Sequence, residues 1–195
     1  MKNLSGFLLL FLSINLLAQN PPADGFDLAG SDAKAIEIAD NVMNSMGGRK
    51  NWDKTRYLTW VFFGNRKHVW DKWTGDVRVE SIRDKSVTLV NINNNTGKVF
   101  RKGALVTEPD SVAKYLKMAK GQWINDSYWL LMPFKMKDSG VTLKYLGETK
   151  TQNNEDAFLL GMTFKEVGNT PQNRYQVWVT KNDNLVKQWA YYQKA

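Results

Sequence analysis

The residues best suited to chemistry lie in one short stretch, residues 66–80, which contains the only histidine of the chain, His68. If this stretch begins with a β-strand, alternation places His68 and Trp70 on one face and Asp71 and Trp73 on the other. Indole rings stack on apolar surfaces and carboxylates transfer protons. The stretch could therefore bind a sugar or hold a catalytic acid.

A turn at Thr74-Gly75 would bring the next strand, with Arg78 and Glu80, back beside these residues. The same pattern has a second interpretation. Cross-strand aromatic pairs and ion pairs are common stabilisers of antiparallel sheets, whether or not the sheet carries a site. Residue type and spacing leave both interpretations open, and the structural one is favoured.

The composition excludes several classes of site. The 195 residues include no Cys and one His, which excludes disulfides, thiolate zinc sites, iron–sulfur clusters and multi-histidine metal sites. No serine lies in a G-x-S-x-G setting. We therefore expect no metal, no cofactor and no enzymatic activity. A hydrolase that uses a carboxylate pair, such as Asp71 and Glu80, remains a less favoured alternative.

The chain is basic, with a net charge of +8, and 12% of its residues are aromatic. These properties would suit a nucleic-acid surface, but the lysines are scattered between the expected strands rather than gathered in a stripe. We expect no nucleic-acid partner. A basic protein of this kind favours an anionic membrane surface or an envelope protein as a partner.

Residues 1–19 have the features of a cleaved signal peptide. Lys2 precedes an apolar stretch of about a dozen residues that ends near Ala18, which is short of the roughly 20 residues needed to cross a bilayer. Without a cysteine at the cleavage site, the protein cannot be a lipoprotein. The sequence therefore predicts an exported, soluble periplasmic protein.

The mature chain is predicted to be one domain, residues 31–195, after a flexible tether over residues 20–30. A helix is expected from Ser31 to Met46, and a second over 112–120 that Gly121 ends. Residues 122–140 are aromatic but not periodic, and Pro133 argues against a long helix there, so we expect a buried loop with short helical turns. The predicted strands alternate apolar and polar residues: Thr55–Phe63, Arg66–Trp73, Asp76–Ile82, Val87–Ile92, Lys98–Arg101, Ala104–Thr107, Val141–Leu146, Ala157–Phe164, Arg174–Thr180 and Leu185–Tyr192.

A sheet of this length must curl because strand twist accumulates, and its apolar inner face must be filled. The expected fold is therefore α+β. It is a strongly curved antiparallel sheet, an unclosed half-barrel of about 9–11 strands, with two or three helices packed in its concave side.

The order of these elements resembles that of the periplasmic lipoprotein-carrier family, the LolA and LolB-like proteins. Two segments, residues 70–75 and 126–135, also resemble an uncharacterised family of exported Gram-negative envelope proteins that shares this fold. The resemblance implies an unclosed barrel, capped by helices, around an apolar cavity for acyl chains.

The expected function is therefore non-catalytic: a monomeric, carrier-like protein that holds a lipid or another apolar ligand. The alternative is an envelope interaction module without a ligand cavity. The candidate residues for lining or closing the cavity are large and mostly apolar: Trp60, Phe62, Trp70, Trp73, Arg78, Tyr128, Trp129, Met132 and Phe134.

Overall fold

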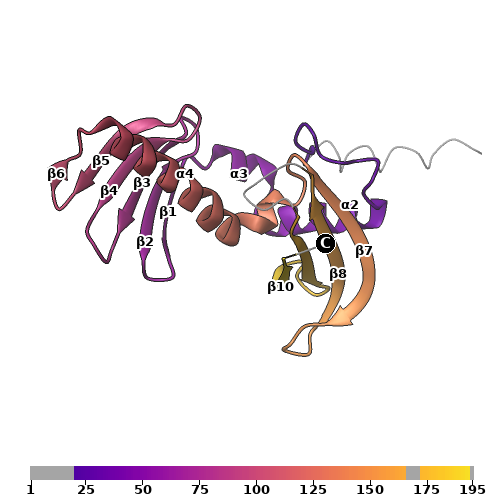
Figure 1. Cartoon of the computed structure of the whole chain (residues 1–195). Coiled ribbons are helices and arrows are strands. Elements are labelled where there is room, and N and C mark those ends of the chain that lie inside the picture. The colour runs from indigo at the N-terminus through magenta and orange to yellow at the C-terminus, as the bar shows by residue number, and fades with distance from the viewer. Residues whose placement is uncertain (1–19, 166–171, 194–195) are drawn as a thin grey trace, which may run out of the picture. The chain divides into compact units, whose positions relative to one another are not determined.

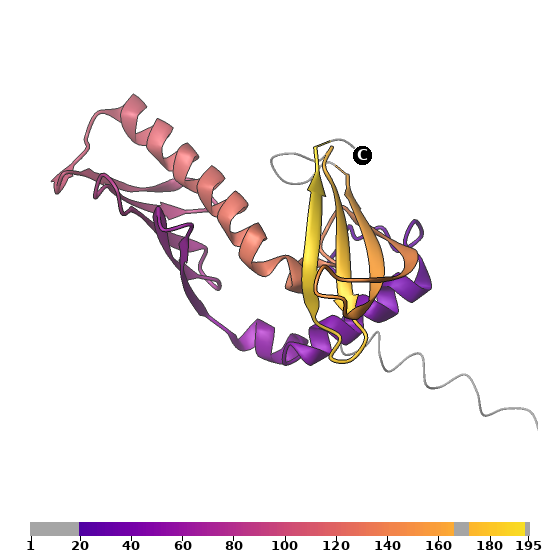
Figure 2. The same cartoon turned by 90° about the horizontal axis from the view of Figure 1, so that it is seen from below.

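A computed structural model describes residues 20–165 and 172–193 (Figures 1 and 2). The predicted signal peptide lies outside the described residues. Three α-helices, one 3₁₀ helix and ten strands are present in the described part: α2 Ala33–Ser45, α3 Arg49–Lys54, β1 Tyr57–Phe62, β2 Arg66–Asp71, β3 Asp76–Ser81, β4 Val87–Asn91, β5 Thr96–Arg101, β6 Ala104–Leu105, α4 Pro109–Leu131, η1 Met132–Lys135, β7 Val141–Lys150, β8 Asp156–Phe164, β9 Arg174–Thr180 and β10 Val186–Tyr192.

The chain divides into two compact units. Unit 2 is the continuous segment Asp53–Met132, and unit 1 combines the N-terminal part, up to Trp52, with the part that follows Met132. Each unit has its own antiparallel sheet: β1 to β6 in sequence order in unit 2, and β10-β9-β8-β7 in unit 1. That the mature chain folds as one domain stays a prediction.

Unit 2 is a six-stranded meander with α4 across one face (Figures 1 and 2). Alternate residues of β3, β4 and β5 bury valine side chains beneath Leu116 and Ala119 of α4. Helix α4 begins where Glu108 accepts hydrogen bonds from the backbone N–H groups of Asp110 and Ser111, with Pro109 in the first turn. The core of unit 2 therefore lies between the sheet and this helix.

Gly97 is required by the close approach of β5 to β4. A Cβ at this position would lie 1.8 Å from the Leu89 carbonyl oxygen and 3.0 Å from Leu116 Cδ2. We expect Gly97→Ala to lower the free energy of unfolding by about 3 kcal/mol, because backbone must move to admit the methyl group. The matched control is Gly121→Ala in α4, where the added Cβ would meet nothing within 4 Å beyond its chain neighbours and the nearby backbone of its own helix. It should stabilise by up to about 1 kcal/mol. Equal effects in urea denaturation would contradict this account.

Unit 1 packs α2 against its four-stranded sheet, with contacts to β7. The buried face of α2 includes Ile38 and Val42, and the sheet contributes Leu143 and Leu160.

The predicted helix start is confirmed, because α2 begins after Asp32. The Asp32 carboxylate does not cap the helix: it accepts a hydrogen bond from the Tyr145 backbone N–H at 2.9 Å. The cap residue thus ties α2 to β7.

Residues 20–30, the predicted tether, are held along unit 1. The Ala23 N–H donates to the Lys137 carbonyl, and the Asp27 N–H donates to the Val141 carbonyl. Phe26 is buried. That this segment acts as a flexible tether stays a prediction, which these contacts do not favour. Pro and Gly residues in the segment suggested freedom, but its backbone and Phe26 both have partners.

The α+β class, the antiparallel pairing and the unclosed sheets are confirmed, and all ten predicted strands are present. The strands form two sheets rather than one continuous sheet. After the two-residue β6, the chain runs for about 35 Å along α4 before β7, which pairs with β8. Each sheet is therefore covered by its own helix.

The predicted end of the second helix at Gly121 is wrong, because α4, 23 residues long in total, continues past Gly121 to Leu131. A glycine inside a helix costs only about 1 kcal/mol. Contacts with the sheet on both sides of Gly121, from Leu116 and Trp123, exceed that cost. Pro133 does limit the helix: α4 ends at Leu131, and Pro133 is the second residue of the 3₁₀ helix η1 that follows.

Among the described helices, none combines the length and apolar character that a membrane crossing requires.

Candidate functional site

The face of the six-stranded sheet that α4 covers is called here the inner face. The register pairs Trp60 with His68 and Phe62 with Arg66 across β1 and β2, so these four side chains share one face with Trp70. The indole ring of Trp70 meets that of Trp123 on α4 edge to face, with ring centroids 5.0 Å apart. The inner face thus joins an aromatic layer on β1 and β2 to the C-terminal half of α4.

A charged cluster lies at the centre of this region. Asp126 of α4 is fully buried and contacts two residues of β2: Arg66 Nε lies 2.7 Å from Asp126 Oδ2, and Arg66 Nη2 lies 2.8 Å from Oδ1. His68 Nε2 lies 2.7 Å from the same Oδ2 atom, and His68 is fully buried too. Asn125 donates a further hydrogen bond to Oδ1 at 2.9 Å. The cluster therefore fixes α4 to β2.

These contacts set the ionisation of the carboxyl group. Burial alone raises the pKa of Asp126, because a charge is costly away from water. The hydrogen bonds from His68 and Arg66 outweigh burial and bring that pKa to about 2. In turn, the hydrogen bonds to Asp126 raise the pKa of Arg66. The carboxylate and the guanidinium are thus both charged at neutral pH.

Several buried nitrogen atoms around this cluster have no hydrogen-bond partner. They are the indole Nε1 atoms of Trp60, Trp70 and Trp123 and the Nδ1 atom of His68. The Trp60 ring stacks on His68 with centroids 4.6 Å apart and an interplanar angle of 14°, so two of these atoms belong to adjoining rings. Leaving a buried polar group unsatisfied costs about 1–3 kcal/mol. Three of these groups lie on the inner face and the fourth, Trp123, faces it from α4, so the unsatisfied atoms are concentrated in one region.

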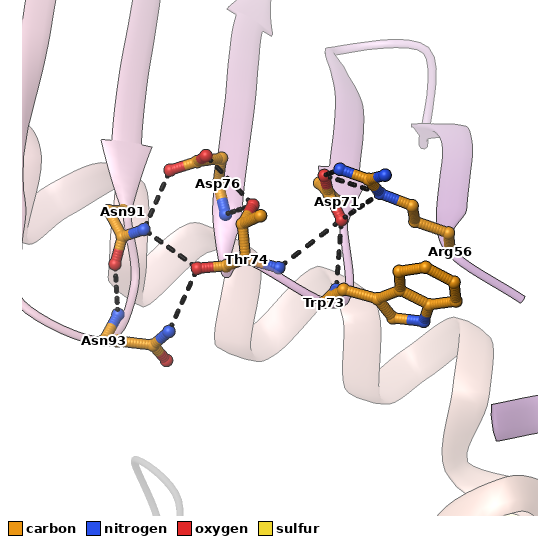
Figure 3. A network of polar contacts seen from close by, with 7 residues as sticks. All are labelled: Arg56, Asp71, Trp73, Thr74, Asp76, Asn91 and Asn93. Atoms are coloured by element: carbon orange, nitrogen blue, oxygen red, sulfur yellow. Dashed lines mark hydrogen bonds and ion pairs between the residues drawn. The ribbon is translucent and has the colours of Figure 1, made fainter. Parts of the chain in front are cut away.

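A second polar network joins the turns at one end of the sheet (Figure 3). Arg56 holds Asp71 through three hydrogen bonds of 2.8–3.1 Å. Asp71 also accepts from the backbone N–H groups of Trp73 and Thr74. The Arg56 hydrogen bonds are the main cause that lowers the pKa of Asp71 to about 2. The first turn is thereby tied to the residue that precedes β1.

The neighbouring turn is held by amide groups. The Asn91 and Asn93 side chains donate to the Thr74 carbonyl at 3.0 and 3.1 Å, and Asn91 also donates to Asp76 at 2.8 Å (Figure 3). The carboxylates here, like that of Asp126, are satisfied within the protein. The network therefore positions two turns, and Trp73 beside it is 62% exposed with the Arg56 guanidinium over its ring.

The two carboxylates of the alternative hydrolase are not brought together. Asp71 ends β2, whereas Glu80 pairs with Lys67 near the start of that strand. Asp71 and the position on β2 that pairs with Glu80 are four residues apart, which separates the two carboxylates by about 13 Å along the strand. Paired carboxylates in glycoside hydrolases lie about 5–10 Å apart. Each of these carboxylates is bound by an arginine: Asp71 by Arg56, and Glu80 by Arg78 at 2.6 Å.

The predicted site residues therefore fall into separate groups. Trp60, Phe62 and Trp70 lie together on the inner face. Arg78 lies on the opposite, exposed face, and Trp73 lies at the turn. That the nine residues line one ligand site stays a prediction.

The aromatic passage after residue 122 is also divided. Tyr128 and Trp129 belong to α4, and Met132 follows it. Trp129 is 41% exposed, so the expectation that the passage is buried throughout is wrong. A helix presents residues on all sides, and only one side of α4 packs on the sheet. Phe134 belongs to unit 1, where its ring stacks on Trp52 with centroids 4.5 Å apart.

Four residues of this region were not among the nine predicted site residues: Arg66 and His68 on β2, and Trp123 and Asp126 on α4. Asp126 contacts Arg66 across 60 positions of sequence. Its one signal was an acidic residue within a passage rich in aromatic residues, where burial without a partner is costly.

No family model matches the sequence, and no curated protein is similar to it. Among solved structures, the chain is similar to the crystal structure of a DUF1329 family protein from Desulfovibrio piger. The two share 14% sequence identity and a TM-score of 0.37, over 81% of this chain and 73% of that chain. This distant likeness assigns neither a family nor a function to the chain.

Proposed function

We propose that unit 2 binds, without catalysis, an apolar ligand that carries hydrogen-bond acceptors, such as an acyl chain with an ester or carboxylate head. The ligand would lie against the inner face at the level of Trp60, Trp70 and Trp123. The protein would act as a carrier-like binding protein of the cell envelope, as the predicted signal peptide suggests.

The observation that supports this proposal is the set of unpartnered indole N–H groups. An indole N–H can only donate, so each of Trp60, Trp70 and Trp123 calls for an acceptor atom. Carbonyl and carboxylate oxygens are such acceptors. Arg66, 28% exposed at its side chain, adds a positive charge beside the aromatic layer. This combination suits a molecule with an apolar body and an oxygen-rich end.

The absence of catalysis is part of the proposal. The hydrogen-bonded pair of His68 and Asp126 resembles the base and the orienting acid of a hydrolase, but a nucleophile must lie beside the imidazole. The nearest serine in sequence to Asp126 is Ser127, whose hydroxyl donates to the Ile124 carbonyl at 3.4 Å. The Trp60 ring covers the imidazole. In this interpretation, His68 and Asp126 stabilise the site.

The test is a titration of detergent-free protein with a fluorescent fatty acid. Trp123→Phe keeps an aromatic ring but removes the N–H donor, and it should weaken binding about five- to tenfold, the effect of one neutral hydrogen bond. The empty variant loses the packing of the larger ring and also an unsatisfied donor, so its stability should fall by less than about 3 kcal/mol.

The matched control is Trp73→Phe at the exposed turn, which should leave the affinity for the fatty acid unchanged. Wild-type protein that binds no fatty acid would contradict the proposal. Equal weakening by both variants would contradict the placement of the ligand on the inner face. The alternative, an interaction module without a ligand, predicts the first of these results.

A further inference from the structure

Three connections meet at one end of the six-stranded sheet, opposite the end drawn in Figure 3. They are residues 63–65 between β1 and β2, residues 82–86 between β3 and β4, and residues 102–103 between β5 and β6. The Ile82 N–H donates to the Asn65 carbonyl at 2.9 Å, which joins the first two connections. Arg101 Nη2, at the end of β5 just before the third connection, lies 3.1 Å from Asp84 Oδ2 of the second. We call the three connections together, residues 63–65, 82–86 and 102–103, the turn end.

Phe63 occupies an unfavourable place at the turn end. It has a φ angle of 43°, and Gly64 after it has a φ angle of 67°. The Asn65 N–H donates to the Phe62 carbonyl, so Phe63 and Gly64 are the central residues of a tight hairpin turn with two positive φ angles. Asn, Asp or Gly is favoured at the first of these positions, and a bulky residue there is strained.

The side chain of Phe63 receives little compensation from burial, because it is 80% exposed. Its ring contacts that of Phe62 at a centroid distance of 4.5 Å, and most of its surface faces water. An aromatic residue that is both strained and exposed breaks two local rules without stabilising the fold. Such positions are commonly retained for function.

The surroundings of Phe63 combine apolar and basic side chains. Ile82 on the adjoining connection is 50% exposed. Arg83, Lys85 and Lys102 are exposed on the same three connections. The single acidic residue of the three connections, Asp84, is paired with Arg101. The turn end therefore has apolar tips within a positively charged rim.

We propose that the turn end docks on the surface of an anionic lipid bilayer. Phe63 and Ile82 reach the boundary between head groups and acyl chains, and Arg83, Lys85 and Lys102 contact the lipid phosphates. Apolar and basic residues together are the composition that binds anionic lipid interfaces. This surface does not depend on ligand binding at the inner face, so either proposal can fail alone.

The test is co-sedimentation with vesicles of equal parts phosphatidylglycerol and phosphatidylcholine, with phosphatidylcholine vesicles for comparison. Wild-type protein should bind the anionic vesicles, and binding should weaken as salt is raised. Each basic residue near an anionic surface contributes about a fivefold gain in affinity, so Arg83→Gln/Lys85→Gln/Lys102→Gln should lose about a hundredfold. The control Lys114→Gln/Lys117→Gln removes charge from the exposed side of α4 and should lose far less.

Phe63→Asn separates docking from folding. Asparagine is favoured where φ is positive, so the melting temperature should stay equal or rise, while vesicle binding falls at least tenfold. Val61→Thr, at a residue of β1 that is also exposed, should leave binding unchanged. Wild-type protein that ignores anionic vesicles would overturn the proposal. A Phe63→Asn variant that binds them normally would overturn it too.

Discussion

Asp126→Ala is expected to lower the free energy of unfolding of unit 2 by about 3–5 kcal/mol. Asp126 is fully buried, and its removal leaves the His68 imidazole and the partly buried Arg66 guanidinium without their carboxylate partner. Breaking a buried ion pair from one side costs this much, because the remaining charge has lost its partner. Urea denaturation followed by circular dichroism measures the change.

The pH dependence gives the same prediction a second readout. The folded pKa of Asp126 is about 2, below the usual value of 3.8. The stabilisation is therefore complete above about pH 4 and is lost as the pH falls towards 2, with a size of about 2 kcal/mol. Asp126→Ala should lack this contribution. The control Asp110→Ala, in the exposed first turn of α4, should cost under about 1 kcal/mol. An Asp126 variant as stable as this control would refute the role of the cluster.

Lys137→Met is expected to destabilise unit 1 by a similar amount, about 3–5 kcal/mol. The Lys137 ammonium forms a buried ion pair with Asp40 of α2 and donates to the Asn20 carbonyl at 2.5 Å. The Asn20 side chain in turn donates to Asp40 at 2.7 Å. Removing the ammonium leaves the almost fully buried carboxylate of Asp40 without its countercharge. Thermal and urea unfolding both measure the loss.

The double variant Asp40→Leu/Lys137→Met is the informative control. Replacing both partners with apolar side chains also removes the unpaired Asp40 charge, so the double variant should regain much of the stability that Lys137→Met loses. Lys135→Met breaks the partly exposed pair with Asp138 and should cost under about 1 kcal/mol. If the double variant is no more stable than Lys137→Met, the loss arises from packing and the ion-pair explanation is wrong.

The strands could be predicted because period-two alternation is a local property. β9 begins at Arg174 and ends at Thr180, as predicted, and β2 differs only at its C-terminal end. Turns with asparagine and glycine marked the boundaries, as at Gly75 and Asn95, both of which have positive φ angles.

The helix and the division into two sheets could not be predicted in this way. Gly121 is a local signal against a helix, and it is outweighed by the packing of Leu116 and Trp123 on the sheet, which is a tertiary effect. Which strands pair across a long interruption is likewise decided by tertiary contacts. β6 ends at Leu105 after two residues, and nothing in its sequence shows that β7 will pair with β8 alone.

The candidate site shows the same limit. The sequence placed His68 and Trp70 on one face because their spacing is local, and this prediction is confirmed. It could not show that Asp126 meets His68, because that contact spans 58 positions and depends on how α4 lies on the sheet. It also suggested Asp71 and Glu80 as partners, although register separates them.

Native mass spectrometry of the protein, purified without detergent from the cells that naturally make it, is the most direct test of the central claim. The account predicts a bound apolar molecule that carries oxygen acceptors, with reduced occupancy in Trp123→Phe and full occupancy in Trp73→Phe. A spectrum that contains the bare polypeptide mass alone, from protein that also binds no added fatty acid, would contradict the claim that the inner face is a ligand site.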